Sequence, residues 1–161
     1  MAFFTGRSGA LYLTTAGSGE VNPASSEAVL KLRDWSLETT LELLETTTVD
    51  TAVKSYTPGA VSSTGSATVL YYRSEVGDVG TQFTSLLNKV MKTATTGVSE
   101  SDRVGMVLRA GTTAGSGSDV KDDIVFNAYI TSASMQVTTA ELTSVAIQFT
   151  VDGPFREVID A

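Results

Sequence analysis

The feature that most constrains this chain is a two-residue repeat of apolar and polar side chains in the segment Val29–Leu44. Successive side chains of an extended strand point to opposite faces, so the repeat predicts a strand with one buried and one solvated face. Leu37, Leu41 and Leu44 also fit helical spacing, but the threonines in and after the segment are poor helix formers and favour the strand. One parity comprises Arg33, Trp35, Leu37, Thr39, Leu41 and Leu43, and the polar parity comprises Asp34, Ser36, Glu38, Thr40 and Glu42.

The rest of the chain is typical of a β-rich domain. Thr favours strands, whereas Ser and Gly favour the turns between them. With 161 residues the chain (residues 1–161) is predicted to form a single domain, mainly β, as an antiparallel sandwich or open barrel. The predicted strands are Gly9–Thr15, Val29–Leu44, Ser66–Arg73, Arg103–Ala110, Ile124–Val137 and Leu142–Val151.

One amphipathic helix is predicted over Val79–Lys92, behind Asp78 as a possible N-cap. Its apolar residues recur at the spacing that brings side chains to one helix face. We expect this stripe to pack against the apolar parity of the Val29–Leu44 strand and to form the core. The predicted core residues are Trp35, Leu37, Leu41, Phe83, Leu86, Leu87 and Val90.

Two segments are predicted to lie outside the sheet. Residues 46–65 have few large apolar side chains and contain Pro58-Gly59, which predicts a long loop with a turn. Residues 152–161 follow the Gly153-Pro154 break and are predicted to form a C-terminal arm.

The composition excludes most catalytic chemistry. The chain contains neither cysteine nor histidine, which removes disulfides, thiolate sites and any role for imidazole. Its net charge of −7 opposes tight binding to nucleic acid, which requires cations to displace counterions from phosphates. The N-terminus does not resemble a signal peptide, and no apolar run is long enough to span a membrane.

The remaining candidate sites also favour a structural role. Gly111–Gly117 lacks the Gly-Lys-Ser/Thr ending of a phosphate loop. The aspartates at 119, 122 and 123 match no EF-hand spacing, and no cluster of aromatics accompanies the carboxylates Glu38 and Glu42. We therefore predict no enzymatic activity, no cofactor and no metal.

The order of these features resembles the tail tube proteins of long-tailed bacteriophages. The resemblance runs from about Leu11 to Gly153 and includes the mid-chain helix. Its first motif is Trp35-Ser36-Leu37 in a Thr/Glu-rich context, followed by Tyr56-Thr57-Pro58-Gly59 and by the segment from Gly65 to Tyr72. The last motif is the closing hairpin, which runs from Phe126-Asn127-Ala128-Tyr129-Ile130-Thr131 to Gln148-Phe149-Thr150-Val151-Asp152-Gly153.

The resemblance implies two packed antiparallel sheets with one flanking helix, and hexameric rings that stack into a tube. Strands of neighbouring copies would join into one barrel around a lumen through which DNA passes without tight binding. Implied partners are further copies of the chain, tape-measure, tail terminator and baseplate or tip proteins, and a sheath protein if the tail is contractile. The location would be the virion tail, after assembly in the host cytoplasm, with no membrane contact.

Particular residues are candidates for these roles. Acidic and hydroxyl groups would suit a lumen that repels phosphates, although a solvated outer face explains the acidic strand equally well. The lumen-lining candidates are Asp34, Ser36, Glu38, Thr40 and Glu42, or the final-hairpin residues Gln136, Thr138, Ser144, Gln148 and Thr150. The candidates for contacts between stacked rings are Val53, Lys54, Tyr56, Pro58 and Gly59.

The alternatives are another non-enzymatic β module, such as a capsid decoration protein, a tail fibre domain or an adhesin, and a hydrolase that uses carboxylates alone.

Overall fold

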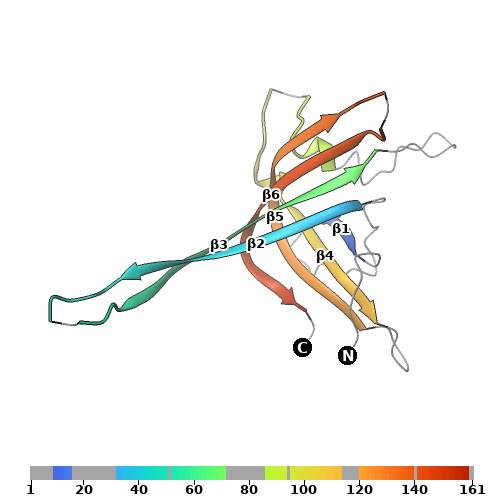
Figure 1. The fold of residues 1–161 in the computed structure, drawn as a ribbon. Helices are drawn as coiled ribbons and strands as arrows, with labels where there is room; N and C mark the ends of the chain where they lie inside the picture. The colour runs from blue at the N-terminus through green and yellow to red at the C-terminus, as the bar shows by residue number, and fades with distance from the viewer. Residues whose placement is uncertain are drawn as a thin grey trace.

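The computed structural model describes residues 9–15, 32–50, 52–71, 86–93, 95–113, 120–139 and 141–159. Within these ranges six strands form one sheet in the order β1-β4-β5-β6-β3-β2, and every neighbouring pair is antiparallel (Figure 1). The strands are β1 (Ala10–Thr15), β2 (Leu32–Glu45), β3 (Tyr56–Leu70), β4 (Val104–Thr113), β5 (Val120–Gln136) and β6 (Ser144–Val158).

The prediction of a mainly β fold is confirmed, but the prediction of two packed sheets is wrong. The long strand β5 joins both halves of one sheet, because residues 120–128 pair with β4 and residues 124–136 pair with β6. The sheet then curls, so that apolar residues of β1 and β4 meet those of β3 and β6 in a single core. Periodicity reports which side chains are buried, and cannot show whether two halves share a hydrogen-bonded strand.

The core is aliphatic with an aromatic centre. Leu11, Met106 and Ile147 are fully buried. The rings of Phe126 and Phe149 stack with centroids 5.7 Å apart. These side chains come from β1, β4, β5 and β6, so the core depends on the curl of the whole sheet.

The predicted core residues have different environments. Leu86 is fully buried, and Trp35, Leu37, Leu87 and Val90 are partly buried against the core cluster. Leu41 was expected in the core but is 48% exposed, because β2 has by then left the body of the sheet. Phe83 lies outside the described residues.

Most of the predicted helix Val79–Lys92 also lies outside the described residues. In the part that is described, residues 86–88 form one helical turn, and the amide of Met91 donates to the carbonyl of Leu87 at 2.8 Å. The other helical element in the described ranges is a 3-10 turn, η2 (Glu100–Asp102). The described residues therefore contain only short helical turns beside the sheet.

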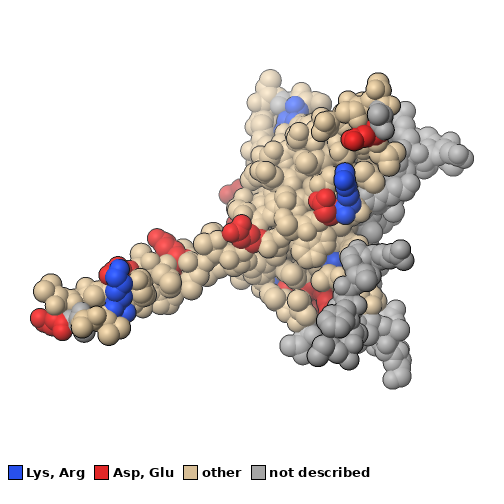
Figure 2. All heavy atoms as spheres, in the orientation of Figure 1, with Lys and Arg blue, Asp and Glu red and all other residues tan. Residues whose placement is uncertain are grey.

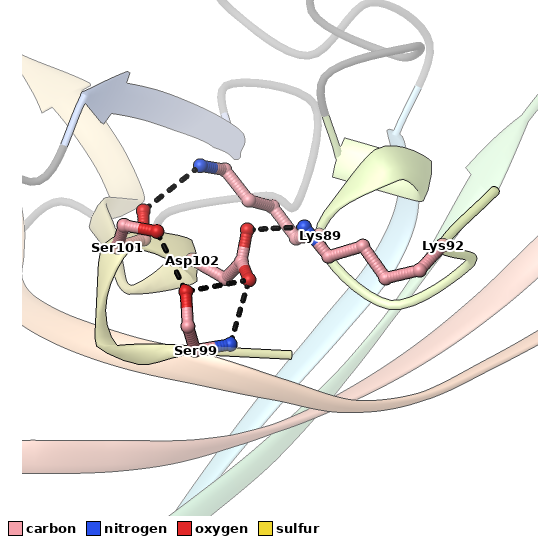
Figure 3. A network of polar contacts seen from close by, with 5 residues as sticks. All are labelled: Lys89, Lys92, Ser99, Ser101 and Asp102. Carbon is pink, nitrogen blue, oxygen red and sulfur yellow. Dashed lines mark hydrogen bonds and ion pairs between the residues drawn. The ribbon is translucent and has the colours of Figure 1, made fainter. Parts of the chain in front are cut away.

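A polar network ties these two short turns together (Figure 3). Lys92 forms an ion pair with Asp102, and the backbone N–H of Ser99 donates to the same carboxylate at 2.8 Å. These two contacts, led by that of Lys92, lower the pKa of Asp102. Lys89 reaches the carbonyl oxygen of Ser101 at 3.5 Å. The network fixes the turn that carries Leu86 against the start of β4.

The second half of the predicted loop over residues 46–65 is a strand, because β3 begins at Tyr56. β2 and β3 continue past the body of the sheet as a two-stranded arm, which projects far from the rest of the molecule in Figure 1. β3 pairs with β6 only from Thr64 to Leu70, so residues 56–63 pair with no strand but β2 within the described part of the chain. Proline cannot donate a backbone hydrogen bond to a ladder, and Pro58 is tolerated because no second strand pairs with this part of β3 on the side away from β2.

Pro58-Gly59 does not form the predicted turn. The register shifts from Leu41↔Val61 to Leu43↔Pro58, so Gly59 and Ala60 together face Glu42 in a β-bulge. A bulge bends a strand and increases its twist. The arm therefore leaves the sheet with a local change of direction.

The predicted C-terminal arm is also mostly a strand. β6 continues to Val158 and pairs again with β5, through Asp152↔Asn127 and Glu157↔Val125. Gly153 adopts a φ of +81°, a conformation that favours glycine, within the irregular stretch between these pairs. The stretch brings the ring of Phe155 edge-on to Phe126, with centroids 5.7 Å apart.

Gly65 generates the first prediction. A Cβ atom there would lie 2.4 Å from Cζ of Phe149 and 2.5 Å from the backbone oxygen of Ser36. The variant Gly65→Ala should therefore lose about 1–3 kcal/mol of unfolding free energy, as overpacked core sites do. Urea unfolding measures the loss. Gly59→Ala is the control, because its nearest contact is 3.3 Å. Equal stability of the two variants would contradict the packing described.

Candidate functional site

The candidate site is a polar face shared by β2, β3, β6 and β5. Three cross-strand rows lie on it, and neighbouring rows are separated by residues whose side chains point into the core. The central row joins Ser36, Ser66, Gln148 and Ser132. The flanking rows are Asp34, Thr68, Ala146 and Ser134, and Glu38, Thr64, Thr150 and Tyr129. The hydroxyls of Ser36 and Ser66 lie 2.9 Å apart and hydrogen-bond across the strands.

The structure brings together the two sets of lumen candidates. The five residues of β2 are all exposed and share one strand face, since they alternate with Trp35 and Leu37. Gln148 lies two strands away on the same side of the sheet, and Gln136, paired with Ser144, lies at its end. Thr138 is exposed but follows the end of β5, so it belongs to the turn.

Sequence reasoning missed the hydroxyl groups of β3. Ser62, Thr64, Ser66 and Thr68 alternate along the strand and complete the face between β2 and β6. The alternation of Ser and Thr from 62 to 68 was a usable signal. It was hidden because residues 46–65 were interpreted as a loop, which left only Ser66 and Thr68 in the predicted strand Ser66–Arg73.

The face is weakly acidic. Asp34 and Glu38 are the charged residues in the three rows, and no lysine or arginine belongs to them. Figure 2 shows uncharged surface over most of the body on one side of the molecule, with carboxylates spaced along the arm and one of them beside a lysine. A surface of this kind is hydrated by its hydroxyls and offers no cation to a phosphate.

A shallow hollow of about 400 Å³ lies on this face where β3 and β6 part. Its lining includes Ser36, Glu38, Thr64 and Gln148. Glu38 is the one ionisable side chain in the lining, so the hollow lacks a second group for acid–base chemistry. In the described part of the chain no cluster of three or more acidic side chains could hold a metal ion.

The free strand edges form the second part of the site. β2 is the last strand of the sheet and pairs only with β3 over its 14 residues, as far as the described residues show. β5 pairs with β4 only as far as Ala128, so within the described ranges residues 129–136 leave a second edge open on the other side of the polar face. Unpaired strand edges readily pair with another chain.

The arm carries the candidates for contacts between rings. Lys54 forms an ion pair with Glu45 at 3.5 Å near the tip. Val53 is 77% exposed there, and Tyr56 is 49% exposed at the start of β3. Pro58 is exposed and Gly59 partly buried at the bulge. These residues line up along the arm and make no contact with the core.

A buried ion pair lies away from the polar face and has no free reactive group. Arg109 of β4 donates to both carboxylate oxygens of Asp123 on β5, at 2.7 and 2.8 Å, and to the hydroxyl of Tyr12 at 2.7 Å. The hydrogen bond with Asp123 raises the pKa of Arg109, which keeps the guanidinium charged. The pair joins β1, β4 and β5 and is structural.

In the described ranges no helix has the length and apolar character needed to cross a bilayer.

Three solved structures share this fold. The chain matches a subunit of the SPP1 tail tube with a TM-score of 0.67 and 14% identity, over 97% of this chain and 80% of the other. It matches a chain in the tail of an empty gene transfer agent particle, refined with C6 symmetry, with a TM-score of 0.66 and 12% identity, over 99% and 100%. The virion of a native gene transfer agent gives a TM-score of 0.62 and 9% identity, over 99% and 100%. No protein-family model and no curated sequence matches the chain.

These matches define the class to which the fold belongs. The chain has the fold of chains found in a tail tube, in the tail of a gene transfer agent particle and in a gene transfer agent virion. One structural counterpart within that class is a subunit of the SPP1 tail tube. At identities of 9% to 14% the likeness is one of fold.

The buried ion pair supplies a prediction. Arg109→Met should cost about 3–5 kcal/mol of unfolding free energy, because it leaves the Asp123 carboxylate buried without a partner. The double variant Arg109→Met with Asp123→Leu removes both charges and should recover much of that loss. Chemical denaturation of the two variants and the native chain gives the comparison. A double variant less stable than the single one would show that the pair does not act as described.

Proposed function

We propose that this chain is the tail tube subunit of a phage-like particle, a non-enzymatic structural protein that forms rings by self-assembly. The observation that carries the proposal is a ribbon of four antiparallel strands with an open edge on each side. The likeness to tail structures supports the same function independently.

The strand directions favour ring closure. In the order β5-β6-β3-β2 each strand runs opposite to its neighbour. A copy related by rotation alone therefore brings its β5 beside β2 in antiparallel orientation, the commoner and slightly more stable kind of pairing. The contact joins two different edges, and repeated rotation closes such contacts into a ring. In a hexamer, the symmetry of the gene transfer agent tail, each copy would add four strands to one barrel.

The burial pattern supports the hydroxyl-rich face as the lining of the lumen. Trp35, Leu37 and Ile147 point into the core, which β1 and β4 complete on that side. The hydroxyl-rich face has no such cover within the described residues and would face inward. A barrel with so many strands leaves an open channel. Its carboxylates, together with the net charge of −7, would repel DNA phosphates.

The proposed partners follow from a tube in a virion tail. Further copies would form the ring and the stack, and a tape-measure protein would occupy the lumen during assembly. Terminator and baseplate or tip proteins would cap the ends, with a sheath around a contractile tail. The arm, with Val53, Lys54, Tyr56, Pro58 and Gly59, would contact the next ring. DNA would pass through without tight binding after assembly in the host cytoplasm.

Amide hydrogen exchange tests ring closure. In free subunits the outward amides of β2 and of residues 129–136 should exchange quickly, and in assembled tubes they should become protected by the new ladder. The measurement is peptide-resolved mass spectrometry of both forms. Residues 104–109 are the internal control, because β1 and β5 already flank them. Tubes whose β2 exchanges as fast as in the subunit would contradict edge pairing, and protein that never assembles would contradict the function.

A charge reversal tests the lumen assignment. The double variant Glu38→Lys and Glu42→Lys should still form tubes, because both side chains are exposed, yet it should slow DNA ejection from particles. The lysines would add phosphate contacts, and each contact increases the salt dependence of DNA binding. Glu100→Lys is the control, since Glu100 lies in η2, outside the polar face. Unchanged ejection by the double variant would count against the assignment.

A further inference from the structure

The two faces of the β2–β3 arm differ in chemistry. Side chains of Leu41, Leu43 and Tyr56 alternate with those of Glu38, Thr40 and Glu42 through the pairing of the two strands. The apolar side is exposed: Leu41 by 48%, Leu43 by 56%, Tyr56 by 49% and Val61 by 62%. Glu45 shares this side of the arm through its pairing with Tyr56 and forms an ion pair with Lys54, whereas the exposed Leu44 lies on the other side. We call Leu41, Leu43, Tyr56, Val61 and Pro58 the apolar face of the arm.

The apolar face continues the buried face of the sheet. Along β2 it follows Trp35 and Leu37 at the two-residue period, and these two side chains are packed against the core. Core contact ends near the pair Thr39↔Ser63, whose hydroxyls lie 2.9 Å apart. Past that point nothing in the described part of the chain covers the apolar side. Large apolar side chains that recur at every second residue, as in the core, but remain exposed indicate an interface.

A second apolar patch lies at the turn between β5 and β6. Met135 is 44% exposed, Val137 71% and Leu142 75%. The ladder between β3 and β6 runs from the pair Thr64↔Thr150 to the pair Leu70↔Ser144. The arm leaves the sheet beyond the first pair, and the β5–β6 turn lies beyond the second, at the opposite end of the ladder. In Figure 1 the arm and the β5–β6 turn project in opposite directions from the body.

We infer that the apolar face of the arm docks on the β5–β6 turn of a copy in the next ring, an inference that rests on the proposed function. Contacts between different patches at opposite ends of a molecule add copies in line without limit. Docking of one arm face on another would instead close into pairs. Residues 135–139 carry no charge, and Glu141 is the one carboxylate in the described part of the turn. On the arm, Glu45 lies on the side of Tyr56 but is already paired with Lys54, so docking brings few like charges together.

The other exposed apolar pair at a strand end fits a stacking contact less well. Val158 and Ile159 are 60% and 45% exposed, at the end of β6. β6 runs from the β5–β6 turn toward the end from which the arm departs, so this pair lies at the arm's own end. A contact there would join two arm ends and stop growth after one step.

Disulfide cross-linking tests the inference, because the native chain contains no cysteine. The variant Val61→Cys with Leu142→Cys, assembled and then mildly oxidised, should give a ladder of covalent multimers on a denaturing gel. The control is Ser62→Cys with Leu142→Cys, which moves the thiol by one residue to the opposite face of the arm and should give little ladder. Unfolding midpoints of both variants confirm that they remain folded.

The outcomes separate the inference from the proposed function. Tubes visible by electron microscopy that yield no ladder with Val61→Cys, or equal ladders with both pairs, overturn the docking site and leave the tube function standing. Native protein that forms neither rings nor tubes overturns the proposed function itself. A ladder specific to the Val61 pair supports both.

Discussion

The sharing of β5 between two partners is the constraint on which the rest of the structure depends. Its first part pairs with β4 and its second with β6, so one sheet curls around its own core. The same arrangement leaves residues 129–136 without a strand partner on one side, as far as the described residues show. On the other side, β2 is the last strand of the sheet. Within the described residues, burial of the core and exposure of the edge at residues 129–136 therefore have one cause, and the end of the sheet at β2 provides the matching edge. Such edges are a hazard for a monomer, and closure into a barrel removes them.

The chemistry of the two sheet faces follows from that curl. One face of β2, β3 and β6 is committed to the core, which leaves Ser, Thr, Gln and acidic side chains on the other. Where the core ends, the side of the sheet that packs against it continues along the arm as Leu41, Leu43 and Val61, which are exposed. The polar face suits a channel whose contents must slide, and the apolar remainder suits contact with another copy. Under the proposed function, one strand pattern would thus serve lumen, core and stacking surface in turn.

The sequence predicted strand positions better than strand partners. The alternation in Val29–Leu44 located β2 and its polar face, because burial of one face leaves a period of two. It could not locate the end of the core, so Leu41 was misplaced. Residues 56–65 lacked an apolar alternation for the opposite reason: both faces of the arm are exposed, and a strand without a core needs few large apolar residues. Gly65 was unremarkable in sequence, yet the ring of Phe149 occupies the space that its side chain would fill.

The central claim is that copies of this chain complete each other's strand edges. Cryo-electron microscopy of the assembled protein, at a resolution that separates strands, tests it directly. The account predicts a continuous ladder across each boundary between copies, with β2 antiparallel to β5 of the next copy and strands about 4.7–4.9 Å apart. A map in which neighbouring copies touch only through side chains, with both edges still open, would contradict it.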